Sequence, residues 1–141
     1  MKAIYIFIFF IHFQFTSHSQ IINKVKITDF TDLIQQSDSI LIINFWATFC
    51  KPCVEEIPDL IQFASKYKKD KVSLYLISLD LADYYPTKIK KFVAAKKYTS
   101  NIAWLDETNA DYFCSIISPE WSGSIPATLF VNKKKRLQKI L

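Results

Sequence analysis

A buried strand, a turn with two cysteines and an amphipathic helix follow one another between residues 40 and 66, and this order constrains the fold more than any other feature. Residues 40–45 are β-branched, aliphatic or aromatic almost without a polar break, which is typical of a central strand covered on both faces. After the cysteines, apolar residues recur at helical spacing, at Val54, Ile57, Ile61 and Ala64. The pattern predicts a helix that begins near Cys50.

Cys50 therefore lies at the N-terminus of the predicted helix, and Cys53 lies one turn inside it. Unpaired N–H groups and the helix dipole stabilise a negative charge at this position, which favours a thiolate. Lys51 adds a positive charge nearby, and Pro52 suits a first helical turn, where its missing N–H costs nothing. We predict that Cys50 is the attacking thiol and that the more buried Cys53 resolves the mixed disulfide.

Two other uses of the cysteine pair remain open, a structural disulfide and part of a zinc site. A disulfide that closes so short a loop constrains the unfolded chain little. A zinc site would need further ligands, but the other cysteine is Cys114, and both histidines, His12 and His18, fall in a segment expected to be removed. We expect no metal and no cofactor, and we expect Cys114 to be a buried structural thiol among apolar neighbours.

The first nineteen residues have the pattern of a targeting segment. Lys2 supplies the positive end, residues 3–15 are almost entirely apolar, and small residues stand at 17 and 19. Cleavage there would leave a single domain over residues 20–141, while an uncut segment would attach the protein to a membrane. Either way the chain is expected in the periplasm or cell envelope, where a reactive thiol pair needs an electron source or acts as an oxidant.

The positive charge of the chain is spread over several short segments. The formal net charge is +5 over 141 residues, and the lysines gather at residues 68–71, 88–91 and 133–136. These segments are interpreted as solvated faces, because no stripe of basic residues alternates with aromatic ones. No nucleic acid is expected among the partners.

The remaining elements predict an α/β fold with a mixed sheet and helices on its faces. Residues 21–27 are extended, and the helix that follows is expected to be capped by Thr28 or Asp29 and to bury Phe30, Leu33 and Ile34. Further strands are predicted over residues 72–79 and 102–105, helices over 86–98 and 110–117, and a terminal hairpin over 127–132 and 137–141.

Two motifs carry a resemblance to a known fold. Residues 45–53, FWATFCKPC, resemble the active-site stretch of the thioredoxin fold, and the Cys-x-x-Cys-x-x-Glu-x-Pro pattern from Cys50 resembles that of the exported TlpA/ResA-like thiol-disulfide oxidoreductases. Residues 121–128, WSGSIPAT, are similar to the cis-proline loop of the same group. The resemblance implies a thioredoxin-like fold, from which the usual C-terminal helix is missing because the sequence stops at Leu141.

The resemblance also implies a substrate site. Pro126 would be cis and lie against the cysteine pair, so that the backbone of Ile125 pairs with an extended substrate segment as an added strand. Trp46 and Phe49 are expected to pack around the pair and limit water access, and Trp46 is counted among the substrate-binding residues.

The second thiol needs a proton acceptor, because Cys53 must be deprotonated to attack the mixed disulfide. Thioredoxins carry a buried aspartate where this chain has Asn44, and an amide does not titrate. Glu56 lies three residues after Cys53 on the same helix face, whereas Glu55 points elsewhere. Glu56 is the candidate proton acceptor, although an acidic residue early in a helix is also favoured by the dipole alone.

The function implied by the resemblance is the reduction of protein disulfides by an exported protein that a membrane electron donor supplies, with cytochrome maturation as one possible task. Two alternatives from other classes remain. The cysteines can hold a soft ion such as Cu(I), or the domain can be a catalytically weak adaptor that keeps the fold as an interaction surface.

Overall fold

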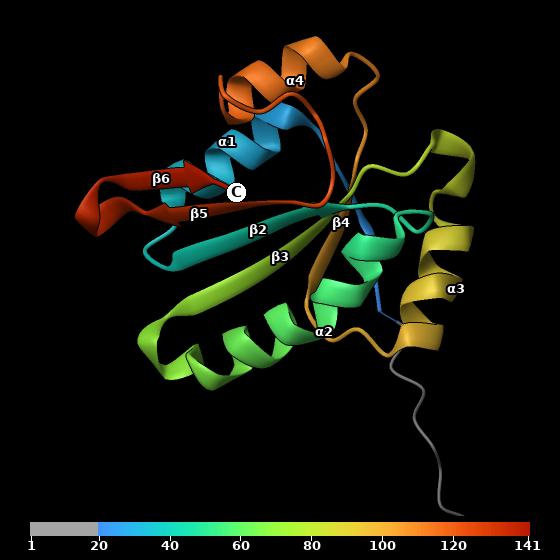
Figure 1. Cartoon of the computed structure of the whole chain (residues 1–141), viewed down its shortest axis with the longest axis horizontal. Coiled ribbons are helices and arrows are strands. Elements are labelled where there is room, and N and C mark those ends of the chain that lie inside the picture. Colours follow the sequence, from blue (N-terminus) through green and yellow to red (C-terminus); the bar gives the residue numbers. More distant parts are fainter. Residues whose placement is uncertain (1–19) are drawn as a thin grey trace, which may run out of the picture.

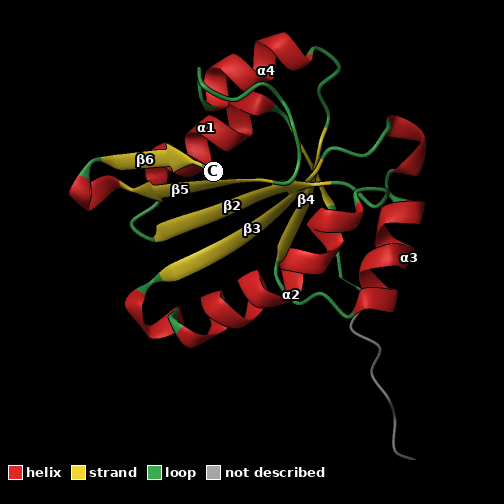
Figure 2. Cartoon of the chain, in the orientation of Figure 1, coloured by secondary structure: helices red, strands yellow, loops and turns green. Residues whose placement is uncertain are grey.

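The computed structural model of the chain describes residues 20–141, so the expected targeting segment lies outside the described residues. One six-stranded sheet in the order β1-β4-β3-β2-β5-β6 forms its centre. Helices α1 and α4 cover one face, and α2 and α3 cover the other (Figures 1 and 2). The strands are β1 (Asn23–Val25), β2 (Ile40–Trp46), β3 (Val72–Ser78), β4 (Asn101–Leu105), β5 (Ala127–Asn132) and β6 (Leu137–Ile140). The helices are α1 (Ile27–Gln36), α2 (Lys51–Lys66), α3 (Thr87–Lys96) and α4 (Ala110–Ile117).

Strand β2 lies in the middle of the sheet, as its apolar sequence predicts. It pairs in parallel with β3 and antiparallel with β5, and six of its seven residues are buried. Because side chains alternate along a strand, Phe45 points into the core under α1 and α4, while Trp46 points into the core under α2 and α3. Strand β2 therefore contributes side chains to both cores and ends just before the loop that carries Cys50.

Helix α2 contains Pro58, yet it continues for 16 residues. Proline has no N–H, so the carbonyl of Val54 has no helical donor four residues on. The hydroxyl of Tyr98 donates to that carbonyl at 3.2 Å, and burial raises the pKa of this tyrosine. A side chain from the loop before β4 thus replaces the missing helical hydrogen bond and fixes α2 to the sheet.

The expected cap of helix α1 needs correction. Helix α1 begins at Ile27 with Lys26 at the N-cap, so neither Thr28 nor Asp29 caps it. Asp29 instead lies in the first turn, where its carboxylate accepts a hydrogen bond from the backbone N–H of Lys26 at 2.8 Å. An acidic side chain at the third helical position thus satisfies the backbone N–H of the N-cap residue. In the sequence, an aspartate at this position looks the same as an aspartate at the N-cap itself.

The end of the described chain is the predicted hairpin. Strands β5 and β6 pair antiparallel around a 3-10 turn, η3 (Lys133–Lys135), and Arg136 adopts a left-handed conformation with φ 49°. Strand β6 is the last element described. Among the helices described, none is long and apolar enough to cross a bilayer.

Candidate active site

The two cysteines form a disulfide at the start of α2, at the end of β2. Their sulfur atoms are 2.01 Å apart. Cys50 is the N-cap residue, and its Sγ accepts a hydrogen bond from the backbone N–H of Cys53 at 3.3 Å. The exposed fraction is 8% for Cys50 and 0% for Cys53. Cys50 is therefore the more exposed of the two cysteines and sits where helix amides stabilise a thiolate, and the order of attack stays a prediction.

A buried carboxylate holds the loop before Cys50, and the sequence analysis missed it. Asp80, only 4% exposed, accepts hydrogen bonds from the backbone N–H of Thr48 at 3.1 Å and from its hydroxyl at 2.6 Å. Ser78 Oγ donates to the same carboxylate at 2.7 Å, and Trp104 Nε1 donates to the carbonyl of Asp80 at 2.7 Å. The loop that carries Cys50 is thus fastened to the end of β3. The one sequence feature that could have indicated this role is the position of Asp80 directly after the strand predicted over residues 72–79.

This clamp gives a stability prediction. Replacing Asp80 with alanine leaves the buried hydroxyl of Ser78 and the partly buried donors of Thr48 without this acceptor, so we expect the free energy of unfolding to fall by about 2–3 kcal/mol. Asp83→Ala is the matched control, because Asp83 is exposed in the neighbouring turn and should change stability by less than about 0.5 kcal/mol. Urea denaturation of both variants measures the difference. Equal values for the two would refute the clamp.

Glu56 on α2 is brought together with Asn44 on β2. Asn44 Nδ2 donates to Glu56 Oε1 at 2.7 Å and to Thr128 Oγ1 at 3.0 Å. Asn44 is fully buried and Glu56 is partly buried, on the helix that carries Cys53. The amide therefore holds the carboxylate of Glu56, three residues after Cys53 in α2, as a hydrogen-bond acceptor. Within residues 20–141 the Oδ1 atom of Asn44 has no hydrogen-bond partner.

The proline loop lies at the start of β5. The Ile125-Pro126 peptide bond is cis, as expected, and a second cis bond at Tyr85-Pro86 was not anticipated. Ile125 and Pro126 are both half-buried. Trp121 in the same loop is buried, stacks on Phe45 with ring centroids 4.5 Å apart and donates from Nε1 to the carbonyl of Ser124 at 2.8 Å. Trp121 therefore shapes the loop from inside.

The aromatic residues next to the cysteines have opposite surroundings. Trp46 is 0% exposed and packs against Phe92 and Tyr98, whereas Phe49 is 65% exposed. Trp46 points into the core under α2 and α3, in the same buried cluster as Cys50 and Cys53, so its side chain presents no exposed surface to a substrate in this structure. Most of the Phe49 ring faces solvent. Substrate binding by Trp46 and shielding of the pair by Phe49 stay predictions.

Cys114 is the buried thiol that the apolar face of α4 predicts. It is 5% exposed, and a Cβ added at Gly123, whose φ is +85°, would approach its Sγ to 3.1 Å. Gly123 is thus required twice, for its left-handed backbone and for the space beside the sulfur. Burial, and then the charge of Asp111, raise the pKa of the Cys114 thiol.

This environment predicts selective labelling. A raised pKa means less thiolate at neutral pH, so iodoacetamide should modify Cys114 in the folded protein many times more slowly than Cys50 after reduction. Labelling of Cys114 should increase only as the pH rises above the usual thiol range, or at neutral pH once urea unfolds the chain. Mass spectrometry of peptides after timed labelling measures both sites, and equal rates at pH 7 would contradict the prediction.

The described part of the chain, residues 20–141, contains no group of three or more histidine, cysteine or acidic side chains arranged to hold a metal ion.

Comparison with known proteins identifies the family. Residues 10–140 match the sequence model described as AhpC/TSA family. The chain belongs to this family. Within it, the chain is 31% identical over 102 residues to thiol-disulfide oxidoreductase ResA of Bacillus cereus (strain ZK / E33L), a match that covers 72% of this chain and 54% of the relative. Sporulation thiol-disulfide oxidoreductase A of Bacillus subtilis (strain 168) is 26% identical over 98 residues, covering 70% of this chain and 56% of that one.

Solved structures agree on the thioredoxin-like fold of this AhpC/TSA family member. A thioredoxin-related protein from Neisseria meningitidis serogroup B superposes with a TM-score of 0.62 at 25% identity, covering 76% of each chain. StoA from Bacillus subtilis gives 0.54 at 23% identity and covers 77% of this chain and 76% of that one. The chain spans about half the length of the curated relatives it matches. The expected ResA-like, thioredoxin-fold family is confirmed.

Proposed function

We propose that the protein is an exported thiol-disulfide oxidoreductase that reduces disulfides in other proteins. The observation that carries this proposal is the Cys50–Cys53 disulfide at the N-terminus of α2, with the outer sulfur accepting an amide hydrogen bond and the inner sulfur fully buried. The names of the relatives, thiol-disulfide oxidoreductases, support the same chemistry.

The reaction begins with the reduced pair. The Cys50 thiolate attacks one sulfur of a substrate disulfide, that disulfide breaks, and a substrate thiolate leaves while a mixed disulfide forms. Cys53 then loses its proton and attacks the Cys50 sulfur, so the mixed disulfide breaks and the second substrate thiolate leaves. Two electrons pass from the dithiol to the substrate, and the Cys50–Cys53 disulfide is the oxidised product.

Glu56 receives the proton that Cys53 releases. Asn44 donates a hydrogen bond to its carboxylate at 2.7 Å, whereas the neighbouring acid, Glu55, is exposed and lies 3.8 Å from Lys51. We expect Glu56→Gln to slow the resolving step about a hundredfold, because the amide cannot take up a proton. Glu55→Gln is the matched control and should resolve at the normal rate. Rapid quenching with acid and mass spectrometry measures the mixed disulfide, and unchanged resolution in Glu56→Gln would exclude this role.

The substrate is an extended protein segment with a disulfide. It pairs with the backbone of Ile125 beside the cis Pro126, which lies in the loop that enters β5 next to the strand carrying the cysteines. A membrane electron donor returns the Cys50–Cys53 disulfide to the dithiol. The protein works in the periplasm or cell envelope, as the apolar first nineteen residues suggest, and cytochrome c maturation is a process that uses such a reductant.

The reduction potential of the Cys50–Cys53 couple tests this proposal directly. Equilibration of the protein with glutathione or dithiothreitol, followed by thiol trapping, should give a value near that of thioredoxin, about −270 mV. A value near −120 mV would make the protein an oxidant and reverse the proposed direction. The absence of a reversible couple would exclude the redox function itself.

A further inference from the structure

The fold brings two lysine-rich turns together at one end of the molecule. The turn η1 (Lys68–Asp70) follows α2, and η3 joins β5 to β6. The two turns lie together at the left end of Figure 1, and residues from both line one hollow. We call this region the basic end, defined by Lys66, Lys68, Lys69, Lys71, Lys133, Lys134, Lys135 and Arg136. The two segments are separated by about half of the sequence, so the sequence alone does not place them side by side.

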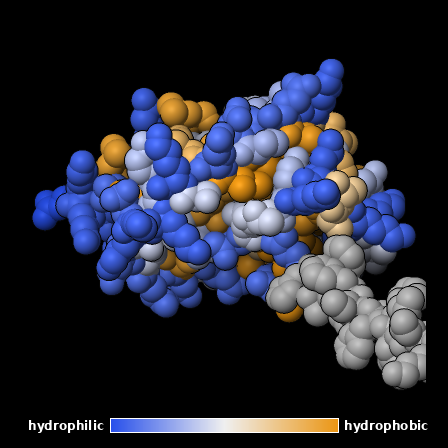
Figure 3. Space-filling model, turned by 90° about the horizontal axis from the view of Figure 1, so that it is seen from below, coloured by the Kyte–Doolittle hydropathy of each residue, from blue (hydrophilic) through white to orange (hydrophobic). Residues whose placement is uncertain are grey.

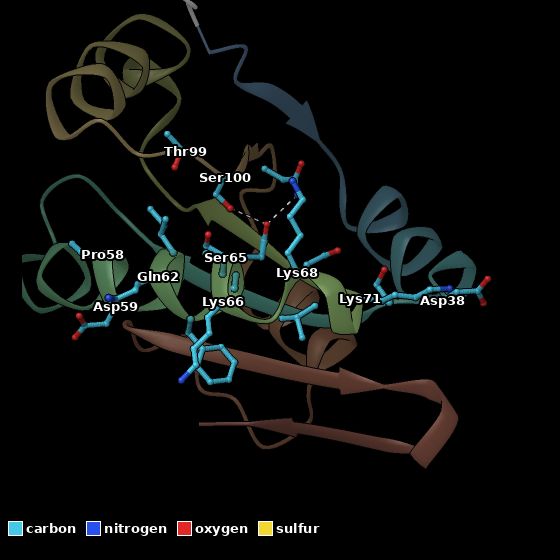
Figure 4. Close-up of a pocket in the computed structure, with 18 residues that line it drawn as sticks. Asp38, Pro58, Asp59, Gln62, Ser65, Lys66, Lys68, Lys71, Thr99 and Ser100 are labelled. Carbon is cyan, nitrogen blue, oxygen red and sulfur yellow. Dashed lines mark hydrogen bonds between the residues drawn. The ribbon is translucent and has the colours of Figure 1, made fainter.

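These cations are largely uncompensated. All eight are exposed, and none lies within ion-pair distance of a carboxylate among the described residues, where the ion pairs involve Lys24, Lys26 and Lys51. The acidic residues that line the hollows at this end are Asp38, Asp59 and Asp70. Figure 4 shows Lys66, Lys68 and Lys71 around one hollow with Asp38 and Asp59. Lys133 donates a hydrogen bond to the carbonyl of Gln35. The balance at this end remains strongly positive.

Large apolar side chains are exposed among these lysines. Phe63 is 48% exposed, lines the same hollow and packs on Tyr67 with ring centroids 4.7 Å apart. Leu137 directly follows Arg136 and is 50% exposed. The end of the molecule to which these residues belong is predominantly hydrophilic in Figure 3, with apolar atoms between the charged ones. Lysines beside exposed aromatic and aliphatic side chains are the combination that binds the interface of an anionic membrane.

The position of the basic end suits such a contact. The backbone N–H of Ile40 donates to the carbonyl of Lys71 at 2.9 Å, so η1 lies at the start of β2, while the disulfide lies beyond the other end of that strand. Seven extended residues span about 20 Å.

We propose that the basic end docks on an anionic lipid surface and directs the cysteine pair away from it. The lysines contact the lipid phosphates, and Phe63 and Leu137 enter the headgroup layer. The contact is independent of redox chemistry. It adds to any attachment through the first nineteen residues, because stable membrane binding usually needs two membrane-binding elements. A membrane is favoured over nucleic acid because aliphatic Leu137 and the apolar residues 3–15 accompany the charge.

The first test is vesicle binding by the full chain. Sedimentation with vesicles of phosphatidylglycerol and phosphatidylcholine is compared with pure phosphatidylcholine, since residues 1–19 can bind either. We expect a preference for the anionic vesicles that weakens with salt. The triple variant Lys68→Glu, Lys69→Glu, Lys71→Glu should lose about tenfold or more of the anionic-vesicle affinity.

The chain offers a matched control for the charge change. Lys88, Lys90 and Lys91 are also exposed, but they lie on α3, on the opposite side of the molecule in Figure 1. Changing these three to glutamate alters the net charge equally and should leave binding within about threefold. An equal loss in both triple variants would show a net-charge effect and overturn the proposal. The proposal would also be overturned if inorganic phosphate, added at constant ionic strength, released the protein from the vesicles. Tighter binding to an oligonucleotide than to the anionic vesicles would overturn it as well.

A fluorescence measurement tests the apolar contact separately. The three native tryptophans are all buried, so Phe63→Trp introduces an exposed reporter at the basic end. Its emission should shift to the blue when anionic vesicles are added. Leu81→Trp is the control, because Leu81 is 68% exposed next to Asp80 at the disulfide end and should show no shift. Equal shifts in both variants, or none in Phe63→Trp, would reject the proposed orientation.

Discussion

Replacing Cys50 with serine is expected to lower the rate of disulfide reduction about a thousandfold or more, because the nucleophile of the first step is lost. Cys53→Ser should fail differently. It keeps Cys50 and forms the mixed disulfide, but no second thiol resolves it, so a covalent complex with the substrate accumulates. Reduction of an insulin disulfide measures the rate, and non-reducing electrophoresis detects the complex.

The third cysteine supplies the control for both variants. Cys114 is buried on the face of the sheet that α1 and α4 cover, whereas the Cys50–Cys53 pair belongs to the core under α2 and α3. Cys114→Ser should therefore reduce insulin at the normal rate. Retained activity in Cys50→Ser would contradict the order of attack, and a trapped complex with Cys50→Ser instead of Cys53→Ser would reverse it.

Truncation of Trp46 is expected to destabilise the protein strongly. The side chain is fully buried between the sheet and the α2–α3 layer, so Trp46→Ala should lower the free energy of unfolding by about 3–5 kcal/mol through lost packing and the cavity that remains. Domains of this size are stable by only about 5–15 kcal/mol, so much of the stability would be lost. Urea denaturation measures the change.

Trp46→Phe separates packing from hydrogen bonding. Within the described residues the Nε1 of Trp46 has no hydrogen-bond partner, so phenylalanine removes volume without leaving an acceptor unpaired. We expect a loss of about 1–2 kcal/mol and unchanged reduction of substrate per folded molecule. A normal stability combined with a raised KM in either Trp46 variant would instead support the substrate-binding role.

Local patterns were sufficient for the elements around the active site. The apolar run at residues 40–45 has almost no polar interruption, and a strand of this kind is stable only in the middle of a sheet, where β2 is found. The spacing after Cys50 is helical, and the observed helix begins at Lys51. Cys50 thereby lies at the N-cap, because the position of a helix start follows from residues next to one another in the chain.

Contacts between distant residues were not predictable in the same way. Asp80 accepts hydrogen bonds from Thr48 across 32 positions, and Tyr98 reaches Val54 across 44. Neither pair has a sequence signature, because each depends on the distance between segments that come together only after the sheet has formed. The surroundings of Trp46 depend on tertiary structure for a related reason. Alternation along a strand assigns Phe45 and Trp46 to opposite faces, but it does not show which helices cover each face.

The amino-acid sequence by itself determined the chemistry of this protein and the local frame that holds it, since the Cys-x-x-Cys pair, its helix and its strand are specified by neighbouring residues. Only the tertiary structure decided what surrounds the pair. Sheet pairing placed Asn44 against Glu56, set Asp80 under the cysteine loop and gathered two separate lysine turns at the far end of β2. These arrangements arise from the packing of segments far apart in the chain, where side chains meet because of strand order and not because of sequence spacing.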